Sequence, residues 1–73
     1  MRKTFQMEDL DCAHCAAKME NAIRDLAGVV DVSVNFVAQK FTLETADEIF
    51  DTVLEKAVKI CRKIEPDCRI ILK

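Results

Sequence analysis

The stretch LDCAHCAAK, residues 10–18, marks the place where a predicted strand gives way to a predicted helix. Before it, residues 4–8 carry an apolar side chain at every second position, which is typical of a short strand. From Cys15 onward, apolar residues recur at helical spacing: Ala16, Met19, Ile23 and Leu26. Cys12 and Cys15 therefore stand at a helix N-terminus, where unpaired amide groups favour a thiolate. Two such thiolates, held by a tight loop, are a pair of soft ligands for a metal ion.

The segment after this helix predicts a β-hairpin. Gly28, the only glycine in the chain, stands where a helix C-cap is expected. An alternating run follows, and its predicted buried face consists of Val30, Val32, Val34 and Phe36. A short turn over residues 37–40 leads to a second alternating run that contains Phe41 and Leu43. Because the connection is so short, the two strands are expected to pair as a hairpin.

A second helix is predicted behind the motif TADE, residues 45–48. In this motif Thr45 would be the N-cap and Glu48 would reach back to it, as in a capping box. The helix is expected to run to about Lys63, and Pro66 then stops it. Its predicted apolar stripe consists of Phe50, Val53, Ala57, Ile60 and Ile64. A last strand follows, in which one face is formed by Cys68, Ile70 and Leu72.

The order of these elements is strand, helix, strand, strand, helix, strand. With right-handed crossovers, this order predicts an α+β fold in which two helices pack on one face of a four-stranded antiparallel sheet, the ferredoxin-like arrangement. A chain of 73 residues is expected to form a single domain, residues 1–73, and it contains no linker, repeat or low-complexity tract.

Composition and charge exclude several classes of function. Hydrophobic residues make up 51% and charged residues 33% of the chain, which is typical of a globular domain. A net charge of −2, with both signs mixed along the chain, provides no basic patch for nucleic acid and no basic run for a membrane surface. No apolar run approaches the ~20 residues that cross a bilayer, and no secretion signal is present. We therefore expect a cytoplasmic monomer with reduced thiols.

The residue types near the cysteine pair favour a divalent ion. Two thiolates complete a two-coordinate complex with Cu⁺, whereas Zn²⁺ prefers about four ligands. Asp11 lies directly before Cys12 and is expected to supply a carboxylate, which suits Zn²⁺ or Cd²⁺ and is also accepted by Pb²⁺. Glu65 lies in a loop that comes near the same end of this fold, and it is a further candidate ligand. His14, between the two cysteines, is expected to point outward.

Three motifs, taken in order, resemble those of the heavy-metal-associated domain: DCAHCA at residues 11–16, LAGV at 26–29 and VSVNF at 32–36. The resemblance covers nearly the whole chain. This family includes copper chaperones, mercury-binding proteins and the N-terminal cytosolic domains of metal-exporting P-type ATPases. Asp11 before the first cysteine and the run KIEPD at residues 63–67 resemble the zinc, cadmium and lead branch of these ATPases. Copper members usually carry Met where this chain has Leu10.

The resemblance implies a cytosolic regulatory or delivery domain of an ATPase that transports Zn²⁺, Cd²⁺ or Pb²⁺. The expected partners are the metal ion and either the other domains of the transporter or a metal-donor or metal-acceptor protein. The domain alone is not expected to be an enzyme. Its sequence has a single histidine, no nucleophile paired with a base and no glycine-rich phosphate loop.

Other interpretations of the same residues stay open. The cysteine pair could serve a free-standing copper(I) chaperone, or a small thiol oxidoreductase that cycles through a disulfide. Asp11 would then be a helix-start residue and Glu65 a solvated loop charge. Cys61 and Cys68 could complete a four-cysteine zinc site, but the gap of six residues between them is too long for a zinc knuckle. We expect both in the core, together with Met7, Leu10 and Met19.

Overall fold

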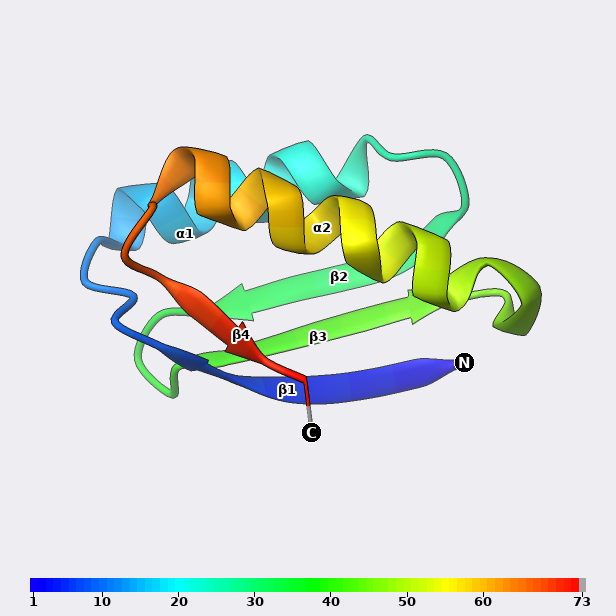
Figure 1. Cartoon of the computed structure of the whole chain (residues 1–73), viewed down its shortest axis with the longest axis horizontal. Helices are drawn as coiled ribbons and strands as arrows, with labels where there is room; N and C mark the ends of the chain where they lie inside the picture. The colour runs from blue at the N-terminus through cyan, green and yellow to red at the C-terminus, as the bar shows by residue number, and fades with distance from the viewer. Residues whose placement is uncertain (73) are drawn as a thin grey trace.

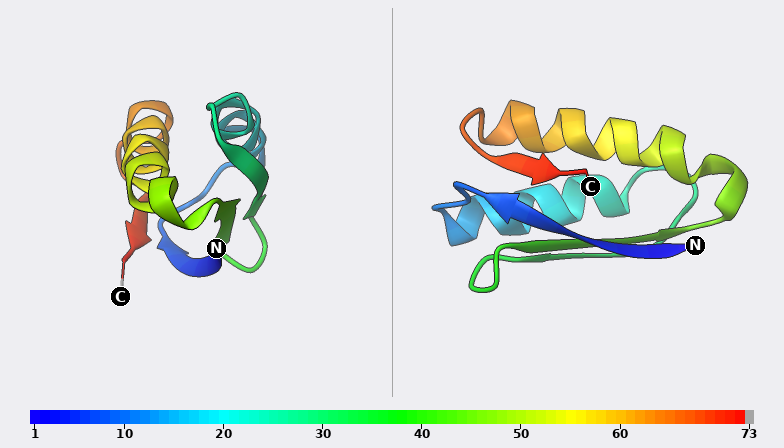
Figure 2. Two further views of the ribbon diagram at one scale, coloured as in Figure 1. Left: turned by 90° about the vertical axis from the view of Figure 1, so that its right-hand side faces the viewer. Right: turned by 60° about the horizontal axis from the view of Figure 1, so that its bottom comes forward.

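The computed structural model describes residues 1–72. Along the chain, the elements are β1 (Arg2–Glu8), α1 (Ala13–Arg24), β2 (Val29–Asn35), β3 (Lys40–Thr45), the short 3₁₀ helix η1 (Asp47–Ile49), α2 (Phe50–Ile64) and β4 (Arg69–Ile71). The strands form one four-stranded antiparallel sheet in the order β2-β3-β1-β4. Both helices cover the same face of this sheet (Figure 1 and Figure 2). The predicted ferredoxin-like arrangement is confirmed.

β1 and β3 form the middle of the sheet. They pair over residues 2–6 of β1, with Phe5 opposite Phe41, and the two rings stack with their centroids 6.1 Å apart. β4 is short and pairs only with residues 6–8 of β1. α1 has its main strand contacts with β2, and α2 has its main strand contacts with β3 and β4.

The hydrophobic core lies between the helices and the sheet. Burying each large apolar side chain there contributes about 1.5–3 kcal/mol to folding. Both helices are amphipathic, and no helix within residues 1–72 is long and apolar enough to cross a membrane. The predicted core positions of Met7, Leu10 and Met19 are confirmed. The largest fully buried apolar side chains are Phe41, Phe50, Met7, Leu10, Met19, Ile23 and Leu43.

The first helix ends earlier than expected from a C-cap at Gly28. α1 ends at Arg24, so Gly28 is not its C-cap. Instead, the N–H of Val29 donates to the carbonyl oxygen of Leu26 at 3.3 Å, which closes a four-residue turn. Gly28 is the third residue of this turn and has a φ of +91°, as in a type II turn. A Cβ atom at this position would also overlap the Cδ1 atom of Ile49, so the turn requires glycine for two reasons.

β2 contains an irregularity that changes which of its valines are buried. The pairing with β3 shifts register between Val29 and Asp31. Val30 lies at this shift and is 69% exposed, whereas Val32 is 2% exposed. The prediction that Val30 belongs to the buried face was wrong, because a β-bulge moves one residue out of the alternation. Val29 takes its place and packs against the core.

The start of the second helix also differs from the prediction. Thr45 is the last residue of β3 and is buried, and its hydroxyl donates to the carbonyl oxygen of Ala46 at 2.9 Å. η1 follows Ala46 and precedes α2. In the described chain, neither η1 nor α2 starts with a side-chain cap. The predicted capping box of Thr45 and Glu48 was therefore wrong, because pairing in the sheet holds Thr45 in the strand. α2 itself ends at Ile64, within one residue of the predicted end.

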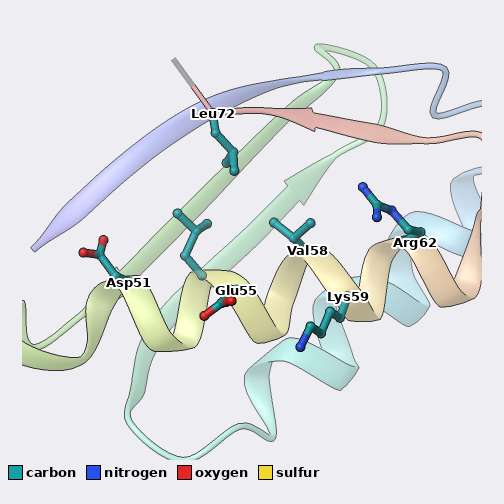
Figure 3. A pocket seen from close by; sticks show the side chains of 7 residues that line it. Asp51, Glu55, Val58, Lys59, Arg62 and Leu72 are labelled. Atoms are coloured by element: carbon teal, nitrogen blue, oxygen red, sulfur yellow. The ribbon is translucent and has the colours of Figure 1, made fainter.

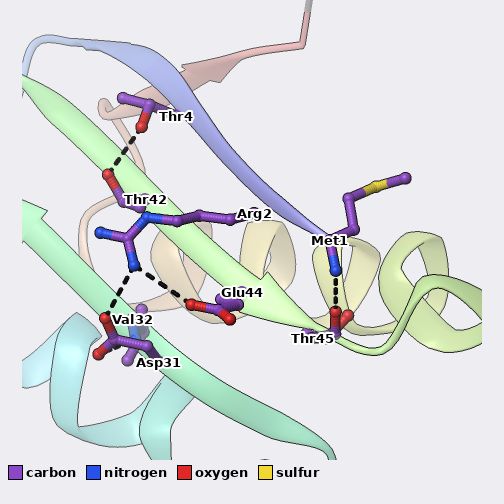
Figure 4. Close-up of polar contacts among 8 residues, drawn as sticks. All are labelled: Met1, Arg2, Thr4, Asp31, Val32, Thr42, Glu44 and Thr45. Carbon is purple, nitrogen blue, oxygen red and sulfur yellow. Dashed lines mark hydrogen bonds and ion pairs between the residues drawn. The ribbon is translucent and has the colours of Figure 1, made fainter.

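The face of the sheet that the helices leave open is polar (Figure 4). The Nη1 atom of Arg2 in β1 donates to Glu44 of β3 at 3.2 Å and to Asp31 of β2 at 3.3 Å, so one guanidinium links three neighbouring strands. The hydroxyls of Thr4 and Thr42 lie 3.0 Å apart on the same face. Such exposed ion pairs contribute little to stability individually.

Three connections lie at one end of the molecule, on the left in Figure 1. They are the loop over residues 9–12 between β1 and α1, the turn over residues 36–39 between β2 and β3, and the connection over residues 65–68 between α2 and β4. Because α1 begins at this end, its unpaired amide groups face it. The cysteine loop therefore lies beside two segments that are distant in sequence.

Candidate metal centre

The loop after β1 determines where the cysteine pair lies. Asp9 has a left-handed backbone, with a φ of +62°, and this conformation ends the extended run of β1. Leu10 is 1% exposed and anchors the loop in the core, as predicted. Asp11 and Cys12 follow, and α1 begins at Ala13. Three residues, of which the first is left-handed and the second is buried, thus separate the strand from the cysteine pair.

Cys12 is the N-cap residue of α1. Its backbone is extended, with a φ of −131° and a ψ of 113°, and its Sγ atom accepts the N–H of Cys15 at 3.2 Å. Its carbonyl oxygen accepts a helical hydrogen bond from Ala16 at 3.0 Å. A sulfur atom thus occupies the position in which a Ser or Asp oxygen usually caps a helix. The positive end of the helix favours negative charge on that sulfur.

The two half-buried thiols hold their protons with unequal strength. The hydrogen bond with the Cys15 thiol, followed by that with the Cys15 amide, lowers the pKa of Cys12. The same side-chain hydrogen bond, assisted by burial, raises the pKa of Cys15 to about 11. Of the two thiols, Cys12 is therefore the more readily ionised. A metal cation that binds both cysteines displaces the thiol protons and gains two sulfur ligands.

Glu65 approaches the cysteine pair from the other helix. It is the C-cap residue of α2, and its N–H donates to the carbonyl oxygen of Cys61 at 2.9 Å. After the larger effects of the Cys12 thiol and of burial, the Glu65 carboxylate also raises the pKa of Cys15, through its charge and through a hydrogen bond. The structure therefore brings Glu65 to the end of the sheet where it was expected (Figure 1), near enough for its charge to act on the Cys15 thiol.

Asp11 and His14 do not join the thiols in one cluster. Both side chains are exposed, as expected for His14. The Asp11 charge acts on Cys68, whose pKa is raised mainly by burial and then by Glu65, Asp9 and Asp11. Within residues 1–72, no three Cys, His, Asp or Glu side chains gather closely enough to hold a metal ion together. A carboxylate ligand would therefore have to join the thiol pair by a side-chain rotation.

The remaining two cysteines belong to the core. Cys61 is 2% exposed and Cys68 is 3% exposed, as predicted. Burial, followed by the charge of Cys68, raises the pKa of Cys61 to about 12. A thiol that resists ionisation in this way is a poor metal ligand, because metals bind the thiolate.

One residue that contacts the cysteine loop was not among the predicted site residues. Gln39, in the turn between β2 and β3, donates its Nε2–H to the carbonyl oxygen of Leu10 at 2.6 Å. Its Oε1 atom accepts the N–H of the same residue at 3.1 Å. A lone glutamine in a turn matches no motif and no periodicity, so nothing in the sequence marked it.

A shallow groove of about 390 Å³ lies elsewhere, between α2 and the end of the described chain (Figure 3). In Figure 3, the apolar side chains of Val58 and Leu72 lie between charged side chains that also border the groove. It is lined by Asp51, Leu54, Glu55, Val58, Lys59, Arg62 and Leu72. Neither Cys12 nor Cys15 contributes to this lining, so the groove is separate from the candidate metal centre.

Comparison with known proteins places this fold and this cysteine pair in a family. The model of the heavy-metal-associated domain matches residues 4–68. The chain belongs to the heavy-metal-associated domain family. It is a heavy-metal-binding module related to the metal-binding domains of P-type ATPases.

The relatives include transporters of more than one metal. A zinc/cadmium/lead-transporting P-type ATPase from Escherichia coli (strain K12) is 39% identical over 59 residues, which are 77% of this chain and 8% of the relative. A copper-transporting ATPase from Rhizobium meliloti (strain 1021) is 34% identical over 55 residues, which are 75% of this chain and 7% of the relative. The chain thus spans less than a tenth of the length of these relatives.

A solved structure supports the fold. The N-terminal domain of a potential copper-translocating P-type ATPase from Bacillus subtilis, in its Cu(I)-loaded state, matches with a TM-score of 0.73. The match covers 94% of this chain and 84% of that domain, at 22% sequence identity. At this level of identity the match concerns the backbone arrangement alone.

Proposed function

We propose that this domain binds one divalent soft metal ion, Zn²⁺, Cd²⁺ or Pb²⁺, through Cys12 and Cys15. Asp11 is the proposed carboxylate ligand, and Glu65 is a further candidate. The domain would be the cytosolic N-terminal delivery or regulatory part of a metal-transporting P-type ATPase. The observation that carries the proposal is the pair of half-buried cysteines at the start of α1, where the Cys12 Sγ atom accepts the N–H of Cys15 at 3.2 Å.

The charges at this site support a divalent ion. Two thiolates and a divalent ion form a neutral unit, which still lacks ligands because Zn²⁺ prefers four. A nearby carboxylate is attracted to this unit, whereas it is repelled by the negatively charged complex of two thiolates with Cu⁺. The charge of Glu65 already acts on the Cys15 thiol, and Asp11 directly precedes Cys12. Because both thiols are half-buried, an ion held there remains within reach of a second protein that could receive it.

The name of the Escherichia coli relative agrees with this choice of metal, since that protein is described as a zinc, cadmium and lead transporter. The two sequences are 39% identical over 77% of this chain. Because the chain spans only 8% of that relative, the transport activity of a whole protein remains part of the proposal.

A specific observation favours Cu⁺ as the second candidate. Among residues 1–72, the structure gathers two thiols but no third ligand of the Cys, His, Asp or Glu type. Two sulfur atoms without a third ligand suit Cu⁺. The Rhizobium meliloti relative, described as a copper transporter, is consistent with this alternative. The free-standing copper chaperone therefore remains the competing proposal.

Replacing Asp11 by alanine separates the two candidates. If Asp11 is a ligand, Asp11→Ala weakens Zn²⁺ or Cd²⁺ binding by about tenfold to a hundredfold, or roughly 1–3 kcal/mol. Cu⁺ binding stays nearly unchanged, because two sulfur atoms satisfy that ion. Competition titrations against a zinc chelator and a Cu⁺ chelator give both affinities. Asp25→Ala, which removes the same charge just beyond the other end of α1, is the matched control. An unchanged zinc-to-copper ratio in Asp11→Ala would show that Asp11 is only a helix-start residue.

Ligand identity is tested by titration with Cd²⁺, followed by thiolate-to-metal absorption. We expect a plateau at one ion per chain, and loss of binding when Cys12 and Cys15 are both replaced by serine. Cys68→Ala is the control and should retain the plateau, since Cys68 is buried in the core. Binding that survives in the double variant, or a plateau at two ions, would contradict the proposed site.

A further inference from the structure

Gln39 occupies a backbone position that suits other residues better. Its φ is +56°, in the left-handed region that glycine and asparagine enter most easily. It is the last residue of the turn between β2 and β3, directly before Lys40. For glutamine this conformation costs free energy, which an interaction of its side chain can offset.

The side chain of Gln39 holds both polar backbone groups of Leu10. Its Oε1 atom accepts the Leu10 N–H at 3.1 Å, and its Nε2 atom donates to the Leu10 carbonyl oxygen at 2.6 Å. Nε2 also donates to the carbonyl oxygen of Phe36 at 2.9 Å, within the same turn. The backbone carbonyl oxygen of Gln39 accepts the N–H of Met7 at 2.7 Å. One residue therefore connects the hairpin turn, the end of β1 and the cysteine loop.

We propose that Gln39 is a positioning residue of the metal centre. Its carboxamide clamps Leu10, two residues before Cys12, and so keeps the loop in the conformation that presents the Cys12 sulfur at the start of α1. This inference rests on the proposed function, because the site that it positions is the Cys12–Cys15 pair.

The buried Leu10 side chain anchors the loop in the core, and the backbone groups of Leu10 need partners as well. Residues 9–12 belong to no helix or strand, and Leu10 is buried, so its N–H and carbonyl oxygen require partners inside the protein. The amide of glutamine supplies one donor and one acceptor in a fixed geometry. Without it, the loop would also adopt conformations in which Cys12 no longer caps α1. A metal ion would then bind only the fraction of molecules that are in the correct conformation, which lowers the apparent affinity.

The variant Gln39→Asn tests the clamp. Asparagine accepts the left-handed backbone and keeps the amide, but it is one methylene too short to reach Leu10. Without metal, we expect hydrogen exchange at the Leu10 amide to become at least about tenfold faster. Exchange at the Met7 amide should not change, because its acceptor is the backbone carbonyl of residue 39. Affinity for Cd²⁺ should fall about tenfold, at the lower end of what is typical for residues that orient metal ligands.

Two further variants make the result decisive. Gln6→Asn shortens the other glutamine of the chain, which is exposed on β1, and should leave exchange at Leu10 and Cd²⁺ affinity unchanged. Gln39→Gly removes the clamp while relieving the left-handed backbone, and it should therefore weaken Cd²⁺ binding without lowering the melting temperature by more than a few degrees.

Two outcomes would overturn the inference. In the first, exchange at Leu10 stays at the wild-type rate in Gln39→Asn, so no clamp exists. In the second, exchange accelerates but Cd²⁺ affinity remains at the wild-type value, so the clamp is structural and does not position the site. Failure of the proposed function looks different: the wild-type domain itself would not bind Cd²⁺ through Cys12 and Cys15, whereas the exchange measurement needs no metal.

Discussion

Replacing Gly28 by alanine should destabilise the domain, because this glycine satisfies two requirements at once. It has a φ of +91° in the turn between α1 and β2. Its Hα also occupies the space where a Cβ atom would overlap Cδ1 of Ile49, in η1. Cγ1 of the same isoleucine would lie at 3.7 Å, an ordinary contact. The strain is thus confined to one methyl group and one backbone dihedral angle.

The expected loss follows from these two terms. A left-handed backbone costs an L-residue about 1–2 kcal/mol relative to glycine. The overlap adds about 1 kcal/mol, at the lower end for overpacking, because Ile49 is 36% exposed and its methyl group can rotate toward solvent. The unfolded chain has less conformational entropy with alanine than with glycine, which offsets about 0.4–1 kcal/mol of this loss in stability. We therefore expect Gly28→Ala to lower the free energy of unfolding by about 2 kcal/mol, or the melting temperature by roughly 10 °C.

Urea unfolding, followed by circular dichroism, measures this loss of stability. A double-mutant cycle with Ile49 separates the contribution of the overlap from that of the backbone dihedral angle. Ile49→Val removes the Cδ1 atom and alone should cost about 0.5 kcal/mol, since Ile49 is partly exposed. In the double variant the overlap disappears, so about 1 kcal/mol of the Gly28→Ala loss should be recovered. The dihedral part should remain. A Gly28→Ala domain as stable as the wild type, or a cycle without coupling, would refute this account of the turn.

Three further predictions concern the core and the sheet. The domain should remain folded when a chelator removes metal, because its core is built from apolar side chains; a coil spectrum in circular dichroism would instead indicate a structural metal. Val30→Thr should change stability by less than about 0.5 kcal/mol and Val32→Thr by clearly more, as measured by urea unfolding, because only Val32 is buried. Stability should fall by about 2–4 kcal/mol as pH rises from 9 to 12, since burial raises the folded pKa of Cys61 to about 12 while the unfolded thiol ionises near 9.0. Thermal unfolding across this pH range should show a smaller fall in Cys61→Ala, and equal falls in both proteins would contradict the assignment.

Features that depend on a local pattern could be predicted from the sequence. The apolar stripes of both helices and the alternation around Phe41 and Leu43 report which side faces the core, and they were sufficient for the fold. The cysteine pair could be found in the same way, because both thiols and the helix start that favours a thiolate lie within four consecutive residues.

Features that depend on a distant partner could not be predicted in this way. Val30 looks like a core residue until the register of β2 against β3 is known. Thr45 looks like a helix cap until its strand is paired. At the candidate site the same limit applies to Gln39, whose contact with Leu10 joins residues 29 positions apart. In each case, a tertiary contact that the local sequence does not reveal decides the outcome.

The four cysteines lie at two depths, and this division has a practical consequence for anyone who handles the protein. An oxidant in solution reaches Cys12 and Cys15 before it reaches Cys61 and Cys68, which the core shields. If Cys12 and Cys15 hold the ion as proposed, air oxidation during storage would abolish ion binding while the helices and the sheet stay intact. A stored sample would then give an unchanged circular dichroism spectrum yet fail a metal titration. The number of thiols that react with a small alkylating reagent is thus the better measure of a competent preparation.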